Sequence, residues 1–105
     1  MVISRRSRRA PDRCPTHPGA LLREVVLPAL SMSKTDFARA LGISRQTLYD
    51  ILAEKQPVTP AMAIRLGWMF DQAPASWLNM QTAYDLWHAE RAVDTSRLRQ
   101  LATAS

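Results

Sequence analysis

The chain has 105 residues, a formal net charge of +5 and one cysteine, Cys14. This length fits one domain with a modest core and excludes an enzyme with a deep cleft between lobes, while one cysteine excludes an internal disulfide or a thiolate metal cluster. No apolar run approaches the roughly 20 residues of a membrane span, and the Arg-rich beginning lacks the apolar stretch of a signal peptide, so we expect a cytoplasmic protein.

Most of the positive charge lies in residues 1–16. They carry five arginines against Asp12, which leaves nine basic and eight acidic residues for the rest of the chain. This segment has almost no large apolar side chains, so we expect a flexible Arg-rich tail. It is either an arm for the DNA backbone or minor groove, which arginine suits, or a leader without a binding role. DNA binding must therefore be argued from the placement of charges elsewhere.

Residues 20–27 are the first expected helix. Its apolar stripe consists of Leu21, Leu22, Val25 and Val26. Arg23 and Glu24 fall outside the stripe and are expected to face water. Pro28 is expected to end this helix, because the residue before a proline avoids helical angles.

Residues 33–55, SKTDFARALGISRQTLYDILAEK, predict two short helices joined by a tight turn. Ser33 and Ser44 are good N-caps, and Gly42 can take a positive φ where the first of the two helices ends. The expected inward residues are Phe37, Ala38 and Leu41 in the first helix and Leu48, Ile51 and Leu52 in the second. This spacing is typical of a helix-turn-helix. The alternative, an ordinary pair of packed helices, does not require the small Ala38 or the turn Gly42.

The outward residues of the second helix, which we call the reading helix, carry groups that match base edges. Gln46 can pair with adenine, Arg45 with guanine, and Asp50 can accept from cytosine. The predicted base-reading set is Arg45, Gln46, Thr47 and Asp50. The predicted phosphate contacts, at helix starts and beside the reading helix, are Lys34, Thr35, Ser44, Tyr49 and Lys55. For Tyr49 and Asp50 the alternative is a solvated surface.

Two further helices are expected after a polar connection. Thr59 and Pro60 predict a helix start, and its inner stripe is Met62, Ala63, Leu66 and Phe70. A last helix begins at Pro74 or Ala75, and its apolar residues wrap more than one face. We expect part of it to cover the core and part to form a homodimer interface of Trp77, Leu78, Met80, Gln81, Tyr84 and Trp87. The alternative is plain packing within one chain.

These elements place a helix-turn-helix domain at residues 17–91 and a C-terminal extension at residues 92–105, which either continues the last helix or frays. His17 and His88 are alone at opposite ends of this domain. No metal-binding pair of side chains and no Gly-rich phosphate loop occurs, so we expect no enzyme, no metal, no cofactor and no small-molecule substrate.

Three blocks of the chain carry a family resemblance: HPGALLREVVLPAL, MSKTDFARALGISRQTLYDILAEKQPVTPAMAIRL and WLNMQTAYDLW. They resemble the HigA-type antitoxins of the XRE/Cro helix-turn-helix repressors. The resemblance implies an all-α, five-helix lambda-repressor-like domain that dimerises through its C-terminal helix. It also implies binding to palindromic operator DNA at the chain's own promoter and neutralisation of a HigB-type ribonuclease toxin. The chain has AEK where the family often has NGK after the reading helix, and the Arg-rich tail lies outside the pattern.

Two other functions stay open at this point. One is a free-standing XRE-family repressor without a toxin, which the absence of a neighbouring ribonuclease gene would favour. The other is an adaptor that binds RNA or an acidic protein through the tail. Deleting residues 1–16 distinguishes the adaptor, because nucleic-acid binding would then disappear from a folded helix-turn-helix.

Overall fold

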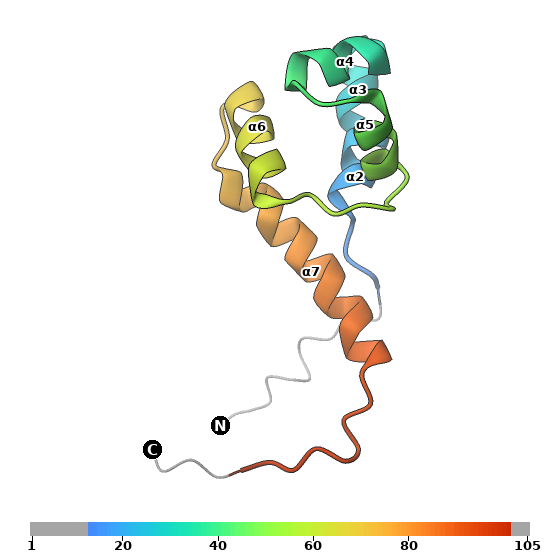
Figure 1. Ribbon diagram of the computed structural model, residues 1–105, viewed down its shortest axis with the longest axis vertical. Helices are drawn as coiled ribbons and strands as arrows, with labels where there is room; N and C mark the ends of the chain where they lie inside the picture. Colours follow the sequence, from blue (N-terminus) through green and yellow to red (C-terminus); the bar gives the residue numbers. More distant parts are fainter. Residues whose placement is uncertain (1–12, 102–105) are drawn as a thin grey trace.

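The computed structural model describes residues 13–101, and within this range every regular element is a helix. The elements in chain order are α2 (Pro18–Leu21), η1 (Leu22–Val26), α3 (Leu27–Leu30), α4 (Lys34–Leu41), α5 (Arg45–Leu52), α6 (Pro60–Phe70) and α7 (Pro74–Ala92). The first three follow one another without a break, so residues 13–101 fold into five helical units (Figure 1). The predicted all-α, five-helix fold is confirmed. Most of the predicted tail, residues 1–12, and residues 102–105 lie outside the described part.

Pro28 does not end the first helix, so that prediction is wrong. The helix runs from Pro18 to Leu30, and its middle section η1 is a π-helical turn in which the Leu27 N–H donates to the Leu22 carbonyl. In a regular α-helix the proline ring would meet the carbonyl four residues earlier. The wider π turn shifts the hydrogen-bond ladder by one residue and lets the helix continue through Pro28. Ser31, the C-cap that follows Leu30, has φ 53°.

The next two helices begin and end where the sequence predicts. Ser33 Oγ accepts the Asp36 N–H at 3.0 Å to start α4, and Ser44 Oγ accepts the Thr47 N–H at 3.0 Å to start α5. Gly42 ends α4 with φ 78°, and its N–H donates to the Ala38 carbonyl at 2.9 Å. The left-handed backbone at this position is one that glycine adopts without strain. Local signals therefore determine the whole helix-turn-helix.

Helices α6 and α7 form an antiparallel pair joined by a very short turn. Gly67 allows this closeness, because a Cβ there would lie 2.6 Å from the Gln72 carbonyl oxygen in the turn. Helix α7 then extends away from the other helices (Figure 1). It ends at Ala92, and the described residues 93–101 are not helical. No helix within residues 13–101 has the length and apolarity needed to span a bilayer.

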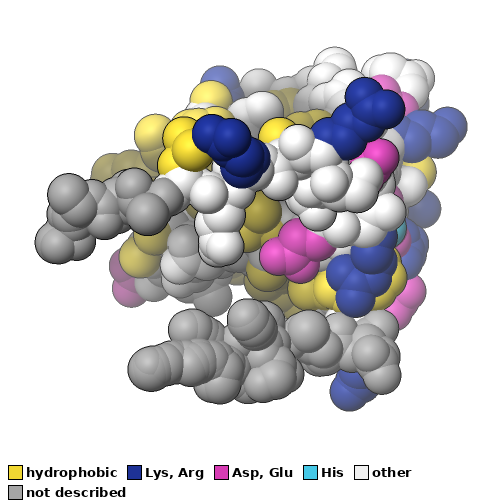
Figure 2. Space-filling model, turned by 90° about the horizontal axis from the view of Figure 1, so that it is seen from below, with side chains coloured by type: hydrophobic (Ala, Val, Ile, Leu, Met, Phe, Trp, Pro, Cys, Tyr) yellow, Lys and Arg dark blue, Asp and Glu magenta, His cyan; other side chains and the backbone are white. Residues whose placement is uncertain are grey.

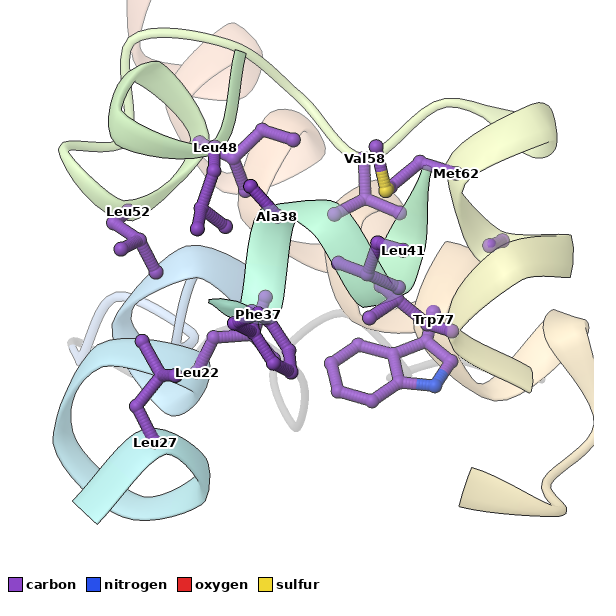
Figure 3. Packing of buried hydrophobic residues seen from close by; sticks show 13 residues of the cluster. Leu22, Leu27, Phe37, Ala38, Leu41, Leu48, Leu52, Val58, Met62 and Trp77 are labelled. Carbon is purple, nitrogen blue, oxygen red and sulfur yellow. The ribbon is translucent and has the colours of Figure 1, made fainter. Parts of the chain in front are cut away.

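One hydrophobic core joins all the helices (Figure 3). Its buried members are Leu22, Leu27, Phe37, Ala38, Leu41, Leu48, Ile51, Leu52, Val58, Met62, Ala63, Leu66 and Trp77. Every inward residue predicted for the helix-turn-helix is among them. The first helix differs from its prediction, because Leu27 is buried and Val25 is exposed. Val58 is also buried, so the connection after α5 is anchored in the core.

Candidate nucleic-acid interface

The outward side of α5 brings together the residues predicted to read bases. Arg45 and Gln46 are exposed at its first turn, and Thr47 and Asp50 are half-buried beside them. The opposite side of α5 is fully used in the core by Leu48, Ile51 and Leu52. An exposed polar face on a helix whose back is buried is the arrangement that a major groove accepts. The DNA contacts themselves stay a prediction.

Asp50 does not present a free carboxylate. Its Oδ1 accepts from Gln46 Nε2 at 2.8 Å, and its Oδ2 accepts from Gln56 Nε2 at 3.2 Å. Gln46 lies one turn earlier on the same helix, whereas Gln56 lies in the connection that follows α5. The contact with Gln56 has no sequence signal, because it depends on how the chain turns back after the helix. Both carboxylate oxygens thus already have partners.

Ser44 and Thr47 also bind to each other. Besides accepting the Thr47 N–H, the Ser44 hydroxyl donates to Thr47 Oγ1 at 2.9 Å. The Ser44 side chain is therefore occupied as a cap. The Thr47 hydroxyl and N–H are thus both engaged with Ser44, and its methyl group is the part of the side chain that could contact a thymine methyl.

The predicted phosphate contacts flank α5. Lys34, the first residue of α4, places its Nζ 5.9 Å from the centre of the Tyr49 ring, at a distance typical of a cation–π contact. Tyr49 is 43% exposed, so this pair is an exposed contact between the two helices of the motif. Thr35 is half-buried beside Lys34, and Lys55 is exposed just beyond the end of α5. Lys34 therefore lies beside Tyr49 of α5, and Lys55 follows the end of the same helix.

Arg23 fixes the end of α5 and does not simply face water as predicted. Its guanidinium donates to the Leu52 carbonyl, and it pairs with Glu54 at 3.3 Å. Glu54 takes φ 64° in the connection, where it turns the chain back toward the first helix. Gly19 adds to this contact, since a Cβ there would lie 1.8 Å from the Ile51 carbonyl oxygen. The first helix therefore supports α5 from behind.

Two of the residues predicted for the dimer interface have places inside the chain. Trp77 is 4% exposed and packs with its ring centroid 6.3 Å from that of Phe70. Gln81 is 5% exposed, and its Oε1 accepts the Val58 N–H at 2.8 Å. Their burial gives both residues a structural role in the monomer, and removes them from the surface that a partner can reach.

The other four residues of that set, Leu78, Met80, Tyr84 and Trp87, are half-buried. Leu86 adds an apolar side chain that is 54% exposed on the same helix. Figure 2 looks onto the end of the molecule where α7 finishes, and hydrophobic side chains are open to solvent there beside Lys and Arg. Apolar surface on α7 thus remains for a partner.

His17 and His88 are not separate, as the sequence interpretation assumed. The Tyr84 ring lies between them, with centroid distances of 4.8 Å to His17 and 4.5 Å to His88. His17 is buried, and its Nδ1 accepts the Gly19 N–H at 2.8 Å, which caps the first helix. Burial lowers the pKa of His17 below its ordinary value of 6.5, and nearby carboxylates offset only part of this shift. Among residues 13–101 no group of three or more His, Cys, Asp or Glu could hold a metal ion.

Known proteins are similar to this chain in sequence and in fold. The helix-turn-helix family model matches residues 22–67. HTH-type transcriptional regulator YddM of Escherichia coli (strain K12) is 43% identical over 86 residues, which cover 82% of this chain and 90% of YddM. The solved structure of antitoxin GraA in complex with its operator is 38% identical with a TM-score of 0.75, over 89% of this chain and 98% of that chain.

A second solved structure, the Pseudomonas aeruginosa antitoxin HigA with higBA promoter, is 41% identical. It has a TM-score of 0.71 over 74% of this chain and 85% of that chain. The three matches cover 74–89% of this chain, and they confirm the resemblance predicted from the three sequence blocks. The chain therefore belongs to the XRE-type helix-turn-helix family, and its structural neighbours are the HigA and GraA antitoxins.

Proposed function

We propose that this chain is a sequence-specific DNA-binding repressor that acts in the cytoplasm as the antitoxin of a toxin–antitoxin module. It occupies an operator at its own promoter and neutralises a HigB-type ribonuclease toxin. One observation carries the proposal: α5 exposes Arg45 and Gln46, with Lys34 and Lys55 also exposed, on a chain that is 38% and 41% identical to antitoxins solved with operator or promoter DNA. The proposal needs no catalytic residue, metal or cofactor.

Binding divides into two kinds of contact. The lysines at the edges of the interface and the helix starts hold phosphate groups, which supplies affinity that falls as salt rises. Arg45 and Gln46 enter the major groove and distinguish bases, each by about 1–3 kcal/mol. Repression follows because a protein held on the promoter blocks access of the polymerase.

The proposal includes a homodimer, because one reading helix contacts too few base pairs to select an operator. Two copies related by a two-fold axis place their reading helices about 34 Å apart, in successive major grooves. We propose that α7 forms the contact through Leu78, Met80, Tyr84, Leu86 and Trp87, which retain accessible apolar surface.

Light scattering of two matched variants tests this interface. Leu86→Arg, on α7, is expected to give monomers at tens of micromolar protein. Trp68→Arg changes the most exposed large hydrophobic side chain of the described chain, which is 85% exposed on α6, and is expected to leave the dimer intact. The reverse pattern would place the interface on α6, and a monomeric wild-type protein would remove the dimer from the proposal.

Two experiments test the function itself. The purified chain is expected to shift DNA from upstream of its own reading frame in a gel assay and to leave a shuffled duplex of the same composition unshifted. Co-expression with the protein of the adjacent reading frame is expected to rescue growth that this neighbour alone arrests. Equal binding to both duplexes would contradict the repressor, and unrelieved arrest would contradict the antitoxin.

The second candidate is a free-standing XRE-family repressor with no toxin. The similarity to YddM favours it, because that relative is described as a transcriptional regulator and covers 82% of this chain. Specific promoter binding without any growth-arresting neighbour would select this alternative.

A further inference from the structure

The inference concerns Asp50, whose carboxylate lies in the middle of the reading face yet has a partner on each oxygen. Gln46 Nε2 donates to Oδ1 at 2.8 Å and Gln56 Nε2 donates to Oδ2 at 3.2 Å. An ionised carboxylate has no hydrogen to donate, so it can only accept. Each amide must therefore turn its nitrogen, and not its oxygen, toward Asp50. The two contacts remove the ambiguity that a glutamine amide otherwise has.

This orientation determines what Gln46 offers to DNA. An amide nitrogen carries two hydrogens, so one N–H bonds to Asp50 while the other remains free beside Oε1. The free donor and the adjacent acceptor form the pair that matches N7 and the N6 amino group of adenine. A glutamine with a freely turning amide could also present donor and acceptor in the reverse order, which lowers its discrimination, and its ordering on binding would lower the affinity.

Gln56 strengthens the arrangement from outside the helix. It lies in the connection after α5, and its contact with the second carboxylate oxygen restrains the Asp50 side chain beside Gln46. The main chain supports the same geometry, since the Lys55 N–H donates to the Asp50 carbonyl at 2.8 Å. Asp50 is thus held by the reading helix and by the segment that follows it.

We infer that Asp50 is a positioning residue, which sets the orientation of the Gln46 amide for adenine, and that it does not itself read a cytosine. The inference rests on the proposed DNA-binding function and deepens it. Gln46 is the specificity-determining residue, and Gln56 completes the positioning.

The test is a double-mutant cycle on base preference. The wild-type chain first selects its site from duplexes with a randomised centre, and affinities are then measured for duplexes that change each base pair in turn. Gln46→Ala is expected to lose discrimination of about 5- to 150-fold at one base pair of each half-site. Asp50→Asn, which can pair with either face of the amide, is expected to lose about 3- to 10-fold at that same base pair. Adding Asp50→Asn to Gln46→Ala is expected to change nothing further.

A matched variant separates positioning from charge. Asp36→Asn removes the same charge from α4, where Asp36 pairs with Arg39 at 3.3 Å and does not contact the reading face. It is expected to leave the pattern of base preference unchanged. Gln56→Ala gives a second variant that does not alter the reading helix, and a smaller loss at the Gln46 base pair is expected. A purely structural effect would lower the affinity for all duplexes together.

Several outcomes would overturn the inference. Loss at a different base pair, persisting without Gln46, would make Asp50 a base reader. An Asp50→Asn pattern equal to that of Asp36→Asn, or no effect of Gln56→Ala at the Gln46 base pair, would remove the positioning role. A wild-type chain that selects no sequence would overturn the proposed function as well, whereas specific wild-type binding with an additive cycle would overturn this inference alone.

Discussion

The reading helix α5 and the first helical segment, residues 18–30, pack closely against each other but are held in different ways. Helix α5 begins at its own cap, Ser44, and its outward side chains contact mainly residues in or just after the helix. The first segment is held by distant residues: Arg23 reaches the Leu52 carbonyl, and its N-cap His17 packs edge-to-face against Tyr84. The two helices therefore have different roles. The exposed face of α5 is available for a partner, while the first segment fixes its position from behind.

The largest expected effect is on stability, from a substitution in the first helical segment. Gly19→Ala introduces a Cβ 1.8 Å from the Ile51 carbonyl oxygen, so the two helices must separate. We expect the free energy of unfolding to fall by about 3 kcal/mol. Urea denaturation measures this, with Ala29→Gly at an exposed position of α3 as the control, which should cost about 1 kcal/mol. A smaller loss for Gly19→Ala than for the control would contradict the close packing of the two helices.

A smaller effect is expected from the cap of the reading helix. Ser44→Ala removes the acceptor for the Thr47 N–H and should lower the free energy of unfolding by about 1 kcal/mol. Ser44→Thr keeps a capping hydroxyl and should retain most of the stability. Thermal unfolding of both variants gives the comparison, and equal losses would mean that the cap is not what holds the start of α5.

The smallest effect is a dependence on pH that belongs to the first segment. Burial lowers the pKa of His17 below 6.5, and its neutral ring is the form that accepts the Gly19 N–H at Nδ1. The unfolded chain therefore takes up a proton first as the pH falls. The contribution of His17 to the free energy of unfolding is present above pH 6.5 and is lost as the pH falls from 6.5 through the folded pKa.

The measurement is the unfolding temperature between about pH 7.5 and 5. His17→Asn keeps a capping acceptor and cannot titrate, so its unfolding temperature should fall less steeply than that of the wild type. Parallel curves for the two proteins would show that His17 does not contribute to the pH dependence.

The same division explains what the sequence can predict. Caps and turns act within a few residues, so Ser33, Gly42 and Ser44 were enough to place both helices of the motif. The outward face of α5 followed from the same periodicity. The hydrogen bond from Gln56 to Asp50 could not be predicted in this way, because the two residues meet only after the chain has turned back.

The support of α5 lies beyond local rules. Arg23 meets residues about 30 positions later, and Gln81 of α7 holds the Val58 N–H from 23 positions away. Pro28 is a case in which a local rule fails. The residue before a proline usually avoids helical angles, but here a π turn lets the helix continue through Pro28. In these places tertiary packing determines the local structure, and a single sequence does not show which distant residues will be in contact.

The central claim is that the exposed face of α5 reads bases while its flanking lysines hold phosphate. Affinities of Gln46→Ala and Lys55→Ala for the selected site and all its single-base-pair variants, at several salt concentrations, test it most directly. Gln46→Ala should relax preference at one base pair, and Lys55→Ala should weaken binding to every duplex alike and reduce the salt slope by about 1. Equal, sequence-independent losses from both variants would contradict the claim.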